Sequence, residues 1–179
     1  MVDPHTVQRW LHRAAFVAIS ALALFIYILP LHVGMGRWPG PDPILAFALA
    51  WVLRRPNWIP LWLAAPVFLL CDFMFLRPPG LWAALCVIAL EFLRTREATS
   101  RDMPFAVEWA MVGGVMLAMA VVYRAVLAVF MVDLTSLGLV ISGQISTLIA
   151  YPFVVLMSAS LLGVRRLTPA EADELRGQA

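Results

Sequence analysis

PILAFALAWVLRR, residues 43–55, is a short apolar run that ends in two arginines, and the number of membrane crossings depends on it. An α-helix needs about 20 residues to cross the hydrocarbon core of a bilayer, so this run is short for a span. If it failed to cross, Arg54, Arg55 and the arginines that follow Leu93 would all move outside, against the positive-inside rule. Charge therefore predicts that residues 43–53 cross the membrane.

The rest of the chain has the same apolar character. Hydrophobic residues make up 63% of the 179 positions and charged residues only 13%. A water-soluble domain of this size could not cover its core with so little polar surface. All 13 basic residues are arginines, and most lie in short gaps between long apolar stretches. The composition predicts an integral membrane protein with one domain and short connections.

Six crossings satisfy the charge pattern. They place ten arginines inside and only Arg37 and Arg77 outside, with Arg124 inside an apolar stretch. We predict an all-α integral membrane protein with six transmembrane helices and cytoplasmic N- and C-termini. Helices two and four are expected to be short, helped by arginine snorkelling, local thinning or shielding by neighbours. The expected spans are residues 14–30, 43–53, 59–76, 80–93, 105–132 and 137–164, followed by a polar cytoplasmic tail at 165–179.

Asp72 is the sharpest candidate for chemistry because it lies inside the third apolar span. A carboxylate there is costly unless it is paired, protonated or facing water. Arg124 lies near the outer end of the fifth span, about 12 Å below the boundary at 1.5 Å per residue. We therefore expect Asp72 to meet Arg124 or Arg77 as an intramembrane polar pair. A structural role in fixing helix register is favoured over a proton or substrate site, because one acidic residue without a polar relay is weak support for transport.

Charged residues at the inner ends of the spans form a second group. Glu91 and Glu108 lie near cytoplasmic arginines and could bind a partner. We interpret them instead as boundary charges with local arginine neighbours. The boundary set is Arg54, Arg55, Glu91, Arg94 and Glu108.

Small residues recur every four positions in the last two spans. Such stripes let helix backbones approach closely, either within one protein or against the membrane helix of another. We favour packing of helices five and six on each other or on helix three. Pro152 should kink the sixth helix. The two stripes are Ala110, Gly114 and Ala118 in helix five, and Gly138, Ser142, Ser146 and Ala150 in helix six.

Enzyme motifs are missing from the sequence. There is no His-Glu-x-x-His, no Gly-x-Ser-x-Gly and no glycine-rich phosphate loop. Cys71 and Cys86 lie in apolar stretches and are interpreted as core residues, while the histidines lack ligand spacing. We expect no enzymatic activity, no cofactor and no metal site. The arginine clusters flank membrane spans, so they do not support nucleic-acid binding.

Several short pieces between residues 41 and 96 form a family pattern. PDPIL at 41–45 opens the second helix and WVLRRP at 51–56 closes it; Asp72, LRPPGLW at 76–82 and EFLR at 91–94 follow. Over this third of the chain the sequence resembles the rod shape-determining protein MreD family. The family more often has Pro-Leu-Gly at residues 78–80, where this chain has Pro-Pro-Gly, and Gly at the position of Phe68.

The resemblance implies a non-catalytic, multi-pass scaffold in the bacterial inner membrane. Such proteins bind MreC directly and act with the actin-like MreB, the glycosyltransferase RodA and its class B penicillin-binding transpeptidase in lateral peptidoglycan synthesis and rod cell shape. The outer edge near Asp72, Arg77 and Gly80 is the expected docking area for MreC. Membrane lipid is a further expected partner, and a homodimer is left open as an alternative to a monomer.

A small-solute binder is the alternative from a different class. MreD-like chains resemble the substrate-binding membrane subunits of vitamin transporters in size and six-helix layout. A solute site needs convergent polar groups in a pocket. Asp72, Arg124 and Gln144 are the candidates for such groups.

Overall fold

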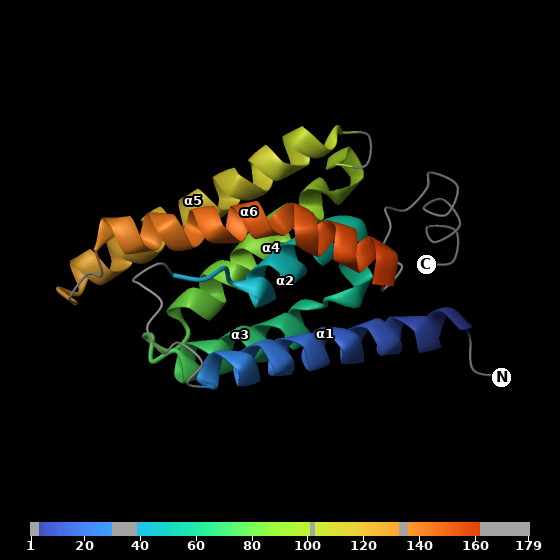
Figure 1. The fold of residues 1–179 in the computed structure, drawn as a ribbon, viewed down its shortest axis with the longest axis horizontal. Helices are drawn as coiled ribbons and strands as arrows, with labels where there is room; N and C mark the ends of the chain where they lie inside the picture. Colours follow the sequence, from blue (N-terminus) through green and yellow to red (C-terminus); the bar gives the residue numbers. More distant parts are fainter. Residues whose placement is uncertain (1–3, 30–38, 101–102, 133–135, 162–179) are drawn as a thin grey trace.

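The computed structural model describes residues 4–29, 39–100, 103–132 and 136–161. These ranges form six α-helices and one short 3-10 turn, without a strand, which confirms the all-helical prediction. The predicted tail at 165–179 and Arg37 lie outside the described residues. The elements, shown in Figure 1, are α1 (Pro4–Ile28), α2 (Pro43–Arg54), η1 (Pro56–Trp58), α3 (Leu61–Met74), α4 (Leu81–Ser100), α5 (Phe105–Val129) and α6 (Leu137–Leu161).

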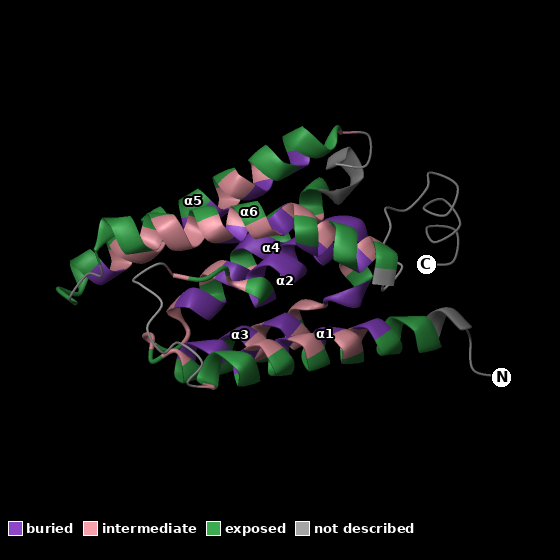
Figure 2. Ribbon diagram, viewed as in Figure 1, coloured by how far each residue is buried: buried purple, intermediate pink, exposed green. Residues whose placement is uncertain are grey.

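Three helices in the described part of the chain are long and apolar enough to cross a membrane. They are Val7–Ile28 in α1, Phe105–Val129 in α5 and Leu137–Ser160 in α6. Figure 2 shows that the outward faces of these helices are largely exposed. The exposed side chains include many large apolar residues, such as Leu117 and Phe153. Exposed apolar surface on this scale indicates contact with lipid, so the structure is that of a membrane protein.

The short helix α2 lies at the centre of the fold. Every residue from Ile44 to Arg54 is buried, and α2 packs against α1, α4 and α6. Its start is well capped, because Asp42 accepts a hydrogen bond from the Leu45 N–H at 3.0 Å and Pro43 occupies the first turn. Twelve residues extend only about 18 Å. The neighbouring helices therefore shield α2 from the membrane, which is one of the ways in which a short helix was expected to be accommodated.

The prediction that the fourth helix is short is wrong. α4 runs for 20 residues, to Ser100, and thus extends about 30 Å. The apolar stretch stops at Leu93, but the helical backbone continues, and Glu91 and Arg94 form an ion pair across one turn. Hydropathy marks where apolar side chains end, which is not where backbone hydrogen bonding ends. The second short helix is α3, with 14 residues.

A backbone carbonyl of α6 that lacks its helical donor accepts a hydrogen bond from a side chain of α5. Pro152 lies inside α6 and has no N–H, so the Leu148 carbonyl, four residues earlier, loses its helical donor. The Trp109 indole Nε1 of α5 donates to that carbonyl at 2.9 Å. Gly113 permits the approach, since a Cβ there would lie 3.2 Å from Leu148 Cδ2. This contact holds the two long helices together.

The predicted small-residue stripes do not make this contact. Ala110, Gly114 and Ala118 are exposed, and an added Cβ at Gly114 would meet nothing within 4 Å. The expectation of internal packing through the α5 stripe is therefore wrong. Successive helical residues point about 100° apart, so Gly113 faces α6 while its neighbour faces outward. In the α6 stripe, Gly138 is exposed and the other three members are half-buried: Ser142, Ser146 and Ala150.

Trp109→Phe should lower the free energy of unfolding by about 1 kcal/mol, because it leaves the Leu148 carbonyl without its donor. The same substitution should cost less in a Pro152→Ala background, where the new backbone N–H can donate to that carbonyl. Unfolding of the detergent-solubilised protein, followed by circular dichroism, measures both values. An equal loss in the two backgrounds would contradict the role given to Pro152.

Candidate functional site

A buried ion pair joins the end of α2 to the start of α5. Arg54 Nη2 lies 2.9 Å from Glu108 Oε1, and the two side chains are 5% and 1% exposed. The Tyr151 hydroxyl of α6 donates to the same Oε1 at 2.6 Å. Arg54 Nη1 also donates to the Ala50 carbonyl at 2.8 Å. The Glu108 carboxylate therefore connects three helices at one point.

This pair corrects the interpretation of Glu108 and Arg54 as boundary charges. Glu108 does have an arginine neighbour, but the neighbour comes from another helix and both groups are buried. A carboxylate in the first turn of α5 also meets the positive end of the helix dipole. Both effects favour the ionised carboxylate inside an apolar core.

Polar residues on one face of α6 lie along α2 from the pair of Arg54 and Glu108 to the start of the helix, and they were not recognised from the sequence. The Trp51 indole Nε1 donates to Ser158 Oγ at 2.9 Å, and both side chains are buried. Thr147, Tyr151 and Ser158 are all buried. Their spacing of four and seven residues places them on one helical face. That periodicity of polar residues in an apolar helix was the available signal.

The remaining members of the predicted boundary set have partners on their own or neighbouring segments. Arg94 Nη1 lies 3.0 Å from Glu91 Oε2, and both side chains are partly exposed. Arg94 Nη2 also donates to the Ile59 carbonyl at 2.8 Å, which connects α4 to the start of α3. The half-buried Arg55 lies over the Trp58 ring, 5.5 Å from its centroid. These contacts show local partners for Glu91, Arg94 and Arg55, and the position of these residues at a membrane boundary stays a prediction.

Asp72 caps a helix instead of pairing with an arginine. Its side chain is fully buried, and Oδ2 accepts from the Gly80 N–H at 2.9 Å and the Ala83 N–H at 3.1 Å. Oδ1 has no hydrogen-bond partner in the described ranges. The predicted pair with Arg77 or Arg124 is therefore wrong. The first N–H groups of α4 have no partner within their own helix, and the helix dipole favours a negative charge there.

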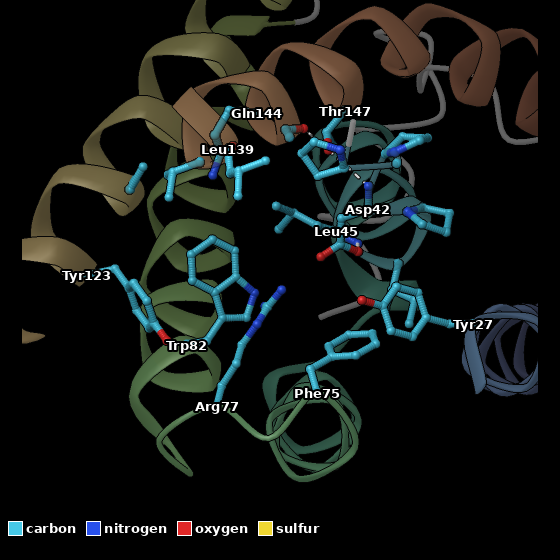
Figure 3. Close-up of a pocket in the computed structure, with 18 of the residues that line it drawn as sticks. Tyr27, Asp42, Leu45, Phe75, Arg77, Trp82, Tyr123, Leu139, Gln144 and Thr147 are labelled. Atoms are coloured by element: carbon cyan, nitrogen blue, oxygen red, sulfur yellow. Dashed lines mark hydrogen bonds between the residues drawn. The ribbon is translucent and has the colours of Figure 1, made fainter. Parts of the chain in front are cut away.

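A cavity of about 670 Å³ lies at the opposite end of α2 from the ion pair. Its wall combines the end of α1, the start of α2, the segment after α3, the start of α4, the end of α5 and the start of α6. We call it the Asp42 pocket. Figure 3 shows the side chains that line it. Its polar and aromatic members are Tyr27, Asp42, Phe75, Arg77, Trp82, Tyr123, Gln144 and Thr147.

The polar groups of the Asp42 pocket are only partly engaged. The Asp42 N–H donates to Thr147 Oγ1 at 2.9 Å, which fixes the start of α2 on α6. The Arg77 guanidinium lies over two rings, 5.0 Å from the Phe75 centroid and 5.2 Å from that of Trp82. Burial raises the pKa of the Asp42 carboxyl above its usual range, while the Leu45 hydrogen bond and the Arg77 cation oppose the rise.

Two of the predicted polar candidates belong to this pocket and two do not. Arg77 and Gln144 line it, whereas Asp72 and Arg124 are not among its lining residues. Asp42 was not recognised as a site residue from the sequence, although its position before Pro43 was a capping signal. Within the part of the chain that the structure describes, no three His, Cys, Asp or Glu side chains gather as metal ligands would.

Comparison of the chain with protein family models, curated proteins and solved structures gives no match.

Glu108→Gln should lower the free energy of unfolding by about 3 kcal/mol, because it leaves the buried Arg54 cation unpaired. Arg54→Met should cost a similar amount by stranding the carboxylate. The double variant Arg54→Met/Glu108→Leu should recover most of the loss, since an apolar pair needs no partner. The exposed pair supplies the control: Glu91→Gln should change stability by about 0.5 kcal/mol or less.

Chemical or thermal unfolding of the purified variants measures these differences. A double variant as unstable as the sum of its two single variants would show that the two charges act independently.

Proposed function

We propose that this protein is a non-catalytic scaffold of the bacterial inner membrane that resembles MreD. In this role it binds MreC and acts with MreB, RodA and the class B penicillin-binding transpeptidase in lateral peptidoglycan synthesis and rod shape. One observation carries the proposal: the charged side chains of the segment that resembles MreD hold the fold together. Asp42 caps α2, Asp72 caps α4, Arg54 pairs with Glu108, and Arg94 bonds to the Ile59 carbonyl.

Such use of charge suits a scaffold better than a catalyst or a proton carrier. Asp72 accepts two backbone N–H bonds, and Glu108 is engaged by a buried guanidinium and a hydroxyl. These contacts would have to break before either carboxylate could exchange a proton. Arg54, Asp72 and Arg94 of the resemblance are therefore engaged in holding helices together.

The proposal includes six crossings with both termini in the cytosol. Two contacts support a common inner side for the arginine clusters. Arg54 joins the end of α2 to the start of α5, and Arg94 joins α4 to the start of α3. Helices that alternate in direction bring these particular ends together. The Asp42 pocket then lies on the outer side, beside the expected docking area for MreC.

A membrane-impermeant thiol reagent applied to intact cells tests this topology. In a Cys71→Ala/Cys86→Ala background, Asn57→Cys should stay unlabelled because the exposed Asn57 follows Arg54 and Arg55 on the inner side. Leu76→Cys, at a position 94% exposed near the Asp42 pocket, should be labelled. Labelling of the first and protection of the second would reverse the orientation.

The alternative is a small-solute-binding membrane subunit, and the Asp42 pocket is the observation that favours it. Its volume of about 670 Å³ lies in the range of small-molecule sites. Asp42, Arg77 and Gln144 supply the convergent polar groups that such a site needs. The shape role is preferred because it also accounts for the residues of the resemblance.

Depletion of the protein in its native cell separates the two functions. Loss of a scaffold for lateral wall synthesis should turn rod-shaped cells round and mislocalise newly inserted peptidoglycan. Microscopy with a fluorescent cell-wall label measures both effects, and re-expression of the wild-type chain should reverse them. Normal shape combined with a defect in nutrient uptake would favour the solute binder.

A further inference from the structure

The Asp42 pocket holds a cation whose hydrogen-bonding capacity is unused. The Arg77 guanidinium is held by the rings of Phe75 and Trp82. Within the described ranges it makes no ion pair within 4.0 Å and no side-chain hydrogen bond. A guanidinium carries five N–H donors in a planar fork that fits carboxylate or phosphate oxygens. Two aromatic faces fix that fork without using its donors. Arg77 is therefore prepared to bind an oxyanion.

An acidic group enters the same pocket from another wall. Figure 3 shows the Asp42 carboxylate at the start of α2 and the Arg77 guanidinium approaching the cavity from different sides. They attract one another, yet they form no ion pair within the same distance limit. A ligand that carries both a negative and a positive group would neutralise each of them. This favours a zwitterion over a simple anion.

The remaining lining identifies the positive group as an amine with N–H donors. Gln144 lines the cavity, and its buried Oε1 has no hydrogen-bond partner among the described residues, so a rotation of the side chain would let this oxygen accept from a donor in the cavity. The rings of Tyr27 and Tyr123 line the same cavity and can face a cation. A primary ammonium satisfies the amide, the carboxylate and the rings together. A quaternary ammonium has no N–H and would leave the amide unsatisfied.

We propose that the Asp42 pocket binds the headgroup of an aminophospholipid, with the phosphate on Arg77 and the ammonium between Asp42 and Gln144. The membrane setting favours a lipid over a free zwitterion. Tyr27 lines the pocket and is 61% exposed, so its ring offers the acyl chains an apolar path along the outside of the protein. The inference goes beyond the scaffold function and does not depend on it.

The test uses the full chain purified in detergent and three lipids of matched acyl chains. Native mass spectrometry should detect phosphatidylethanolamine bound roughly ten-fold more tightly than phosphatidylglycerol, which lacks the ammonium. Phosphatidylcholine, which lacks N–H donors, should also bind more weakly. Equal binding of the three lipids would overturn the proposal. Soluble glycerophosphoethanolamine that binds as tightly as the lipid would assign the pocket to a free solute and would also overturn it.

Two substitutions separate the recognition elements. Arg77→Gln should weaken phosphatidylethanolamine binding roughly ten-fold, through loss of the charge-assisted bonds to phosphate. Asp42→Asn should abolish the preference over phosphatidylglycerol while leaving the helix intact, because asparagine is an equally good N-cap. Arg96→Gln is the matched control. Arg96 also lies over a ring, 5.3 Å from the Phe92 centroid, but outside the pocket, so binding should not change.

The melting temperature of each variant verifies that it is folded. Folded Arg77→Gln protein that retains wild-type affinity would overturn the proposal. Wild-type protein that binds neither lipid nor soluble headgroup would also overturn it, and would leave the pocket to a partner's polypeptide. Neither result would contradict the proposed role in cell shape, because the depletion experiment measures cell form independently of any ligand.

Discussion

The buried pair of Arg54 and Glu108 is the constraint on which the rest of the structure depends. A helix as short as α2 can lie in the middle of a membrane protein only if its charged end is neutralised there. Removal of an arginine from water is costly, and one carboxylate at 2.9 Å offsets that cost only with further hydrogen bonds. Tyr151 and Ala50 supply them. This network holds α2, α5 and α6 together at one point.

The same physical rule recurs wherever a helix begins or is interrupted. Apolar surroundings offer no water to backbone groups that lack a helical partner, so side chains from other helices must serve them. Asp72 of α3 accepts from the first N–H groups of α4, and Trp109 of α5 donates to the carbonyl freed by Pro152 of α6. Each of these contacts satisfies a backbone group and also fixes the position of one helix against another.

The polar groups at the two ends of α2 differ in how fully they are paired. At its C-terminal end the charged groups are paired and buried, which favours rigidity. At its N-terminal end a guanidinium, a carboxylate and an amide oxygen surround a cavity without satisfying one another. The paired groups and the groups that face the cavity are thus separated along one helix. In the proposed scaffold role, a ligand or partner binds at one end while the pairing at the other end keeps the body rigid.

The sequence by itself determined the helical class, the apolar segments and the importance of the short run at 43–53. These properties follow from hydropathy and charge, which are read locally along the chain. Only the tertiary structure decided which polar groups meet. Trp51 and Ser158 are 107 positions apart, and Gly113 rather than Gly114 faces α6. Asp72 bonds to backbone N–H groups, which carry no signature in the sequence. The geometry between helices sets such partners, and no local pattern encodes it.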